Sequence, residues 1–151
     1  MSSLIIRARF ERLYDRRELR DWATRGVYIN LGGNPVATAR VGEGWVDTRA
    51  AAAWRRPTER LIACDLGGNL RAKRDAQIVE WLILEEYRWR MGRLPRRNYQ
   101  AGKSSVVAKS LSRRDTLRVH ISGCNPLNGR PGRKIIVAVE RDDHGFVWDW
   151  N

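Results

Sequence analysis

The sequence predicts a single α+β domain in which antiparallel strands pack on one central helix. Its 151 residues match the length of about one domain, 1–151. One segment, 75–91, has a helical apolar period long enough to cross a core. Alternation with a period of two, which is typical of strands, occurs near both ends of the chain. Helices flanked by separate groups of strands indicate the α+β class.

The first third begins with a strand. Apolar residues alternate with other side chains over 4–10, which is typical of a half-buried strand. Asp15 and Glu18 then have the spacing of a helix N-cap and its reciprocal Glu, and Gly26 ends the helix. Strands are expected at 27–31 and 36–41, separated by a Gly-Gly-Asn turn.

The order of landmarks in this region recurs once. A related unit predicts a helix at 48–56 and a strand at 60–65. Either a duplication or coincidence in a chain rich in Gly, Arg and Ala explains the match. The matching pairs are Asp15 and Asp47, Arg17 and Arg49, Trp22 and Trp54, and the Leu-Gly-Gly-Asn segments at 31–34 and 66–69.

The central helix and the C-terminal strands follow. Asp75 is the predicted N-cap of the helix at 75–91, and Gly92 is its left-handed end. Alternating or continuous apolar runs near the C-terminus predict a three-stranded antiparallel meander. Its expected strands are 117–121, 135–140 and 146–150, with turns at 128–129 and 143–145.

A basic segment, residues 88–118, is the most informative feature for function. Its ten basic side chains are opposed by one acidic residue, Asp115. The segment therefore holds most of the chain's net charge of +12. Such density is typical of a surface that binds a polyanion or an acidic protein. Of the 29 basic residues 25 are Arg, which favours bidentate phosphate contacts, although a GC-rich genome gives the same bias.

Most of this segment is expected to form a loop or arm at about 92–114, with a short helix at 105–111. Its side chains are predicted to follow a phosphate backbone, with Tyr99 as a stacking face. Six such contacts to duplex DNA would give a salt slope of roughly 5. Alternatively, Arg88 and Arg90 stabilise the helix end and other arginines pair with acidic residues. The predicted binding residues are Arg88, Arg90, Arg93, Arg96, Arg97, Tyr99, Lys103, Lys109, Arg113, Arg114 and Arg118.

The sequence also suggests three catalytic hypotheses, with less support than nucleic-acid binding. Gly102-Lys103-Ser104 lacks the earlier glycine of a phosphate-binding loop, because position 97 is Arg. His120 with Arg118 and Glu85 or Glu86 would suit a metal-free ribonuclease. A group near the C-terminus would suit a divalent metal, or simply a solvated turn. Its members are Glu140, Asp142, Asp143, His144 and Asp149.

Three functions are therefore expected, in this order. The first is a small, non-catalytic nucleic-acid-binding protein of bacterial or phage type, without metal or cofactor. The second is a structural or inhibitory subunit of a larger assembly, with Trp148 and Trp150 as partner-binding anchors or as core closure. The third is a small nuclease or toxin. With two cysteines and no apolar membrane segment, we expect a cytoplasmic protein, or a virion protein if phage-encoded.

Overall fold

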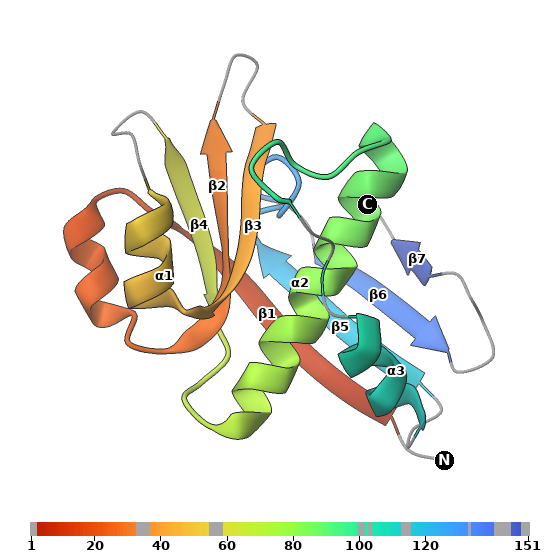
Figure 1. Cartoon of the computed structure of the whole chain (residues 1–151). Coiled ribbons are helices and arrows are strands. Elements are labelled where there is room, and N and C mark those ends of the chain that lie inside the picture. Colours follow the sequence, from red (N-terminus) through yellow and green to blue (C-terminus); the bar gives the residue numbers. More distant parts are fainter. Residues whose placement is uncertain are drawn as a thin grey trace.

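One mixed β-sheet organises the computed structural model, in the strand order β3-β2-β4-β1-β5-β6-β7 (Figure 1). The structure describes all residues except 1–2, 33–36, 55–58, 100–101, 103, 113–115, 133, 141–145 and 149–151. For 104, 111–112, 139–140 and 146–148 it describes the backbone alone. The elements are β1 Ser3–Leu13, the 3-10 helix η1 Arg16–Asp21, β2 Arg25–Gly32, β3 Ala37–Trp45, α1 Val46–Ala53, β4 Arg60–Asp65, α2 Leu70–Met91, α3 Ser104–Ser112, β5 Thr116–Gly123, β6 Ile135–Glu140 and β7 Phe146–Trp148.

The chain forms one α+β domain, as predicted, but its sheet is not antiparallel throughout. The first strand, β1, is antiparallel to β4 and parallel to β5. Parallel neighbours need a long connection, and here most of the chain lies between Ser3 and its partner Thr116. The predicted antiparallel sheet is therefore a mixed sheet, with a parallel pair at its centre.

The C-terminal strands differ from a simple meander for the same reason. Strand β5 is antiparallel to β6, but its other edge is taken by β1. The segment that joins β5 to β6 is not a tight hairpin, because it folds back to β3. There the buried Thr38 hydroxyl donates to the backbone carbonyls of Pro126 and Leu127, at 3.1 and 2.9 Å. Strand β7, which is three residues long, pairs with β6 and adds one more strand to the sheet.

The main core lies between the sheet and α2, which crosses the sheet in Figure 1. Alternate side chains of β1 and β5, among them Leu4, Phe10 and Val119, point into this core. The predicted helix forms, but it begins five residues earlier than expected. Its N-cap is Asn69, whose side chain accepts the Ala72 N–H at 2.9 Å, and Asp75 instead pairs with Arg74. Gly92 ends it in the left-handed conformation, as predicted.

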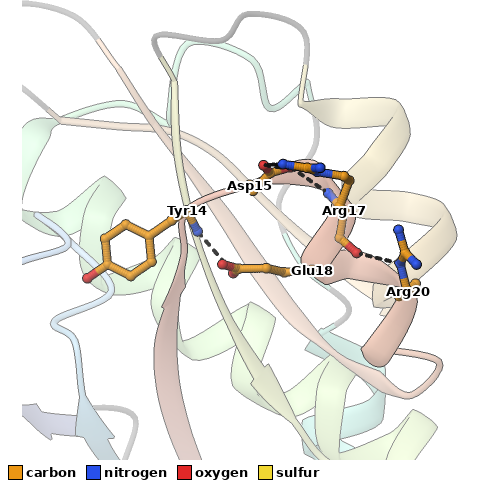
Figure 2. A network of polar contacts seen from close by, with 5 residues as sticks. All are labelled: Tyr14, Asp15, Arg17, Glu18 and Arg20. Carbon is orange, nitrogen blue, oxygen red and sulfur yellow. Dashed lines mark hydrogen bonds and ion pairs between the residues drawn. The ribbon is translucent and has the colours of Figure 1, made fainter.

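A second, smaller core lies on the opposite face of the sheet. It joins η1 and α1 to β2 and β4, and its largest side chains include Tyr28 and Trp54. The helix predicted after Asp15 is only a short 3-10 helix, which ends at Asp21 rather than at Gly26. Asp15 caps it as predicted (Figure 2), and Arg17 lowers the pKa of this carboxyl to about 2, first through its side-chain hydrogen bond.

The two units of the weak repeat are only partly equivalent. Each supplies a short helix and a strand, because η1 precedes β2 and α1 precedes β4. Their Leu-Gly-Gly-Asn segments differ: Asn69 caps α2, whereas Gly33 and Asn34 lie outside the described residues. The structure gives no further support for a duplication.

Candidate nucleic-acid interface

Within the part of the chain that the structure describes, helices cover half of the sheet on both faces and the other half on one face only. The second core covers β2 and β4 but reaches no farther along β1 than Leu13. Beyond that point the outer side chains of β1, β5 and β6 face solvent. They include Ile5 and Ile136, which are 40% and 43% exposed. We call this surface the open sheet face, and its described side chains are Ser3, Ile5, Arg7, Arg9, Glu11, Thr116, Arg118, His120, Ser122, Lys134, Ile136 and Ala138.

The open sheet face carries concentrated positive charge. Arg7, Arg9, Arg118 and Lys134 are all exposed. The carboxylate of Glu11 lies 3.5 Å from Arg9 and is itself exposed, so it offsets only one of the four cations. Proteins contact the phosphates of nucleic acids largely through Arg and Lys side chains, and a row of such cations on a β-sheet is suited to those contacts.

His120 lies in the middle of this charge. Its cross-strand partners are Arg7 on β1 and Ile136 on β6. Desolvation lowers the pKa of the imidazole, and the charges of Lys134, Arg7 and Arg118 lower it further. Its Nδ1 atom is buried and has no hydrogen-bond partner among the described residues. The ring is therefore kept neutral in a strongly cationic setting.

The basic segment predicted to bind nucleic acid does not form one surface. Its first two arginines pair within α2, Arg88 with Glu85 at 2.6 Å and Arg90 with Glu86. The alternative placed Arg88 and Arg90 at the helix end as stabilising cations, and the structure gives both of them a carboxylate partner there as well. Arg118 lies on the open sheet face, because it alternates with the core residues Leu117 and Val119 on β5.

The side chain of Arg97 is also bound within the fold. Its guanidinium donates to the Glu59 carboxylate at 2.7 Å and to the Ala53 carbonyl at 2.5 Å. Its own carbonyl accepts from Arg40 at 3.1 Å, and its N–H donates to Ala39 of β3. This side chain is only 17% exposed, so it holds the basic arm against the sheet instead of facing a ligand.

Other residues of the basic segment remain at the surface. Arg93 and Arg96 are exposed, and Tyr99 is 92% exposed. The predicted short helix is α3, where Lys109 is exposed and has an interaction with its surroundings. Lys103, Arg113 and Arg114 lie outside the described residues.

The catalytic candidates have different outcomes. Glu85 and Glu86 belong to α2, on the face of the sheet opposite His120, so they do not form the ribonuclease group that was considered. Within the described residues, no three His, Cys, Asp or Glu side chains gather as metal ligands. Outside the described side chains lie Glu140, Asp142, Asp143, His144, Trp148, Asp149 and Trp150.

A cleft lies where the covered half of the sheet meets the open sheet face. Its volume is about 460 Å³. Strand β1 supplies Arg9 and Glu11, and the end of β4 supplies Asp65. Asp21 and Trp22, from the end of η1, complete its lining. Because Arg9 belongs to both features, the cleft continues directly into the cationic face.

Apart from Arg118 and His120, the residues of the open sheet face were not predicted from the sequence as site residues. The period of two over residues 4–10 already placed Arg7 and Arg9 on the outer side of β1. That signal was present, but nothing in the sequence indicated that no helix covers this side.

The two cysteines are the remaining side chains that could take part in a reaction. Both cysteines are free, and burial raises the pKa of the Cys64 thiol to about 12, so Cys64 is a neutral core side chain. Among the described helices, none has the length and apolar character needed to cross a bilayer.

Comparisons with protein-family models, curated proteins and solved structures give no match, so the functional conclusion depends on the chain's own geometry and charge.

Proposed function

We propose that this chain is a non-catalytic nucleic-acid-binding protein that holds a phosphate backbone across the open sheet face. The observation that carries the proposal is the cluster of Arg7, Arg9, Arg118 and Lys134 around His120 on an uncovered β-sheet. Each cation projects from a strand or its immediate end, so the backbone that carries it is already ordered before binding and only side-chain entropy is lost. Of the basic side chains of this segment that the structure describes, Arg118 alone belongs to the site.

Binding is favoured over catalysis by the surroundings of His120. In a metal-free nuclease the partner of the reacting histidine is most often a carboxylate or a second imidazole. The charges that act on His120 here are those of Lys134, Arg7 and Arg118, all of them cations. This environment suits an anionic ligand that is held and released unchanged.

The test is a salt series with a fluorescently labelled single-stranded oligonucleotide, measured by anisotropy, with RNA, DNA and duplex in parallel. Four phosphate contacts to a single strand predict a log–log slope of about 3. The double variant Arg7→Glu/Arg118→Glu is expected to reduce affinity at least about 100-fold, because each reversed charge repels a phosphate.

Two double variants with the same charge change serve as controls. Arg71→Glu/Lys73→Glu alters exposed residues of α2, on the other side of the sheet, and is expected to retain most of the affinity. Arg93→Glu/Arg96→Glu tests the basic arm. Absence of binding by the wild type, or a loss with the arm variant that the face variant does not show, would overturn the proposed site.

A second candidate function has its own observation. Trp89 on α2 is 85% exposed and lies close in sequence to the exposed Met91 and Arg93. Exposed Trp and Arg side chains are typical of protein interface hot spots. We propose a protein contact here if the chain is a subunit of a larger assembly. Loss of a co-purifying protein in Trp89→Ala, with oligonucleotide affinity unchanged, would support that function.

A further inference from the structure

The cleft beside the open sheet face is suited to one base of a bound strand. Resting on the proposed function, we infer that this cleft admits a single unpaired guanine while the neighbouring phosphates lie on the cationic face. The cleft volume of about 460 Å³ is in the range of small-molecule sites and exceeds what one base occupies. The ligand must be single-stranded, because a base in a duplex is stacked and paired.

Trp22 gives the cleft an aromatic surface. Its side chain is half-buried and packs against the second core, next to Leu19 and Trp54. The ring is therefore held in place by the fold and still lines the cleft. Stacking of a base on a fixed aromatic ring is a common means of binding single strands, and it tolerates any base.

The polar lining supplies the preference among bases. Asp65 is fixed before any ligand arrives, because its Oδ1 atom accepts from the Thr24 hydroxyl and from the Gly67 N–H at 2.9 Å. Asp21 and Glu11 add further carboxylates to the same lining. An ionised carboxylate only accepts hydrogen bonds, so the edge of the base that enters must donate them.

Guanine meets this requirement better than the other bases. Its N1–H and its N2 amino group are adjacent donors, which call for two carboxylate oxygens. The Asp65 Oδ1 atom already accepts from Thr24 and Gly67, so we assign the two donors to the second oxygen of Asp65 and to an oxygen of Asp21. Adenine and cytosine place a single amino group beside an acceptor nitrogen, and uracil places its one N–H between two carbonyl oxygens. A carboxylate would face an acceptor in each of these three cases.

The charge distribution separates the base from its backbone. The three carboxylates of the lining repel phosphate, whereas Arg9, where the cleft meets the open sheet face, and Arg7 on that face attract it, so the backbone is directed out of the cleft. A cationic peptide side chain is the competing occupant of an acidic cleft with a Trp. The cations of the open sheet face disfavour that occupant, because they repel the rest of such a peptide.

The experiment compares four oligonucleotides of about 12 uridines, long enough to span one binding site. The central residue is guanosine, inosine, adenosine or uridine. We expect guanosine to bind about tenfold more tightly than uridine, as one pair of hydrogen bonds to the base would give, and inosine to lose most of this gain because it lacks the N2 amino group.

Variants assign the preference to the cleft. Asp65→Asn keeps an oxygen for Thr24 and Gly67 but replaces the other carboxylate oxygen, and it is expected to abolish the guanosine preference while binding to all-uridine persists. Asp21→Asn, at an exposed position, is expected to reduce the preference with no effect on folding. Glu43→Gln, on β3 and outside the cleft lining, is the control and should keep the full preference.

Each other outcome has a definite meaning. Equal affinity for the four oligonucleotides would overturn the guanine site and leave the proposed function standing. Failure of all four to bind would overturn both. Displacement of the oligonucleotide by an arginine-rich peptide, without any preference among the four bases, would assign the cleft to a cationic protein segment and also overturn the inference.

Discussion

The side chain of Asn98 pairs with Val41 in the manner of a neighbouring strand. Its Oδ1 accepts the Val41 N–H at 2.8 Å, and its Nδ2 donates to the Val41 carbonyl at 2.8 Å. Strand β3 is the last strand at this side of the sheet, so part of its free edge is satisfied by the basic arm. Exposed strand edges promote association between chains, and covering them prevents it.

Asn98→Ala is expected to lower the free energy of unfolding by about 2 kcal/mol, because it leaves two backbone groups of β3 without partners. Urea unfolding followed by tryptophan fluorescence measures this change. The neighbouring Tyr99→Ala is the control, since Tyr99 is 92% exposed and should alter stability by less than about 0.5 kcal/mol. Equal effects of the two substitutions would contradict the edge-covering role.

His120 predicts opposite effects of pH on stability and on binding. Its pKa is lowered in the folded state, below the ordinary value of about 6.5, by desolvation and by Lys134, Arg7 and Arg118. The unfolded chain therefore binds more protons just below that pH. The contribution of His120 to stability is complete above about pH 6.5 and is lost as the pH falls through this range.

Binding should respond in the other direction. Phosphates on the open sheet face offset the three cations and favour the imidazolium, so oligonucleotide affinity should rise as the pH falls from about 7.5 to about 5.5. His120→Gln should flatten this dependence, whereas His144→Gln, at the only other histidine, should preserve it. A pH dependence that persists in His120→Gln would separate the histidine from the binding surface.

Gly102 lies against the backbone of α2. A Cβ atom at this position would come within 2.6 Å of the Trp81 Cα atom, which is closer than side chains tolerate. Gly102→Ala is therefore expected to cost about 1–3 kcal/mol of stability, as for other overpacked sites. Gly132→Ala is the matched control, because the heavy atoms nearest to a Cβ atom at position 132 would lie 3.8 Å from it. Thermal unfolding of both variants measures the difference.

The N-cap of α2 gives a test in which the structure and the sequence pattern disagree. Asn69→Ala should cost about 1 kcal/mol, and Asn69→Asp should be neutral or stabilising because a carboxylate also favours the helix N-terminus. Both are measured by urea unfolding. A cap at Asp75, as the sequence suggested, would instead make Asn69→Ala neutral.

The early start of this helix shows a limit of sequence patterns. The regular apolar stripe begins at Ala76, so Asp75 appeared to be the last residue before it. The turn from Leu70 to Arg74 is mostly polar, and only Ala72 in it is buried. Local periodicity therefore predicted the existence and the end of the helix, but not its first turn.

The strands were predicted well, whereas the parallel pairing of β1 with β5 was not. Alternation near Leu4 and Leu117 predicted both strands, since the period of two is local. Their parallel pairing depends on how the whole intervening chain packs. For the same reason the outward direction of Arg7 was predictable, whereas the absence of a covering helix was not.

Adjacent arginines show why charge density along the chain does not by itself locate a binding surface. Arg96 and Arg97 are equivalent in the sequence, but only Arg97 meets a carboxylate, because the fold brings Glu59 beside it. Arg96 lies near Gly32 and remains exposed. Counting charges along the chain does not separate arginines that stabilise the fold from those that face a ligand.

The position of β1 also has a consequence for the order of folding. The strand precedes both of its partners in the chain, and its pairing with β4 involves only Phe10 to Leu13. The rest of its length pairs with β5, from Ser3 with Thr116 to Phe10 with Gly123. During synthesis on the ribosome, most of β1 must therefore remain unpaired on this side until the last third of the chain has emerged. Contacts over so long a separation slow folding, so the N-terminal strand is the part of the nascent chain most exposed to chaperones and to misassembly.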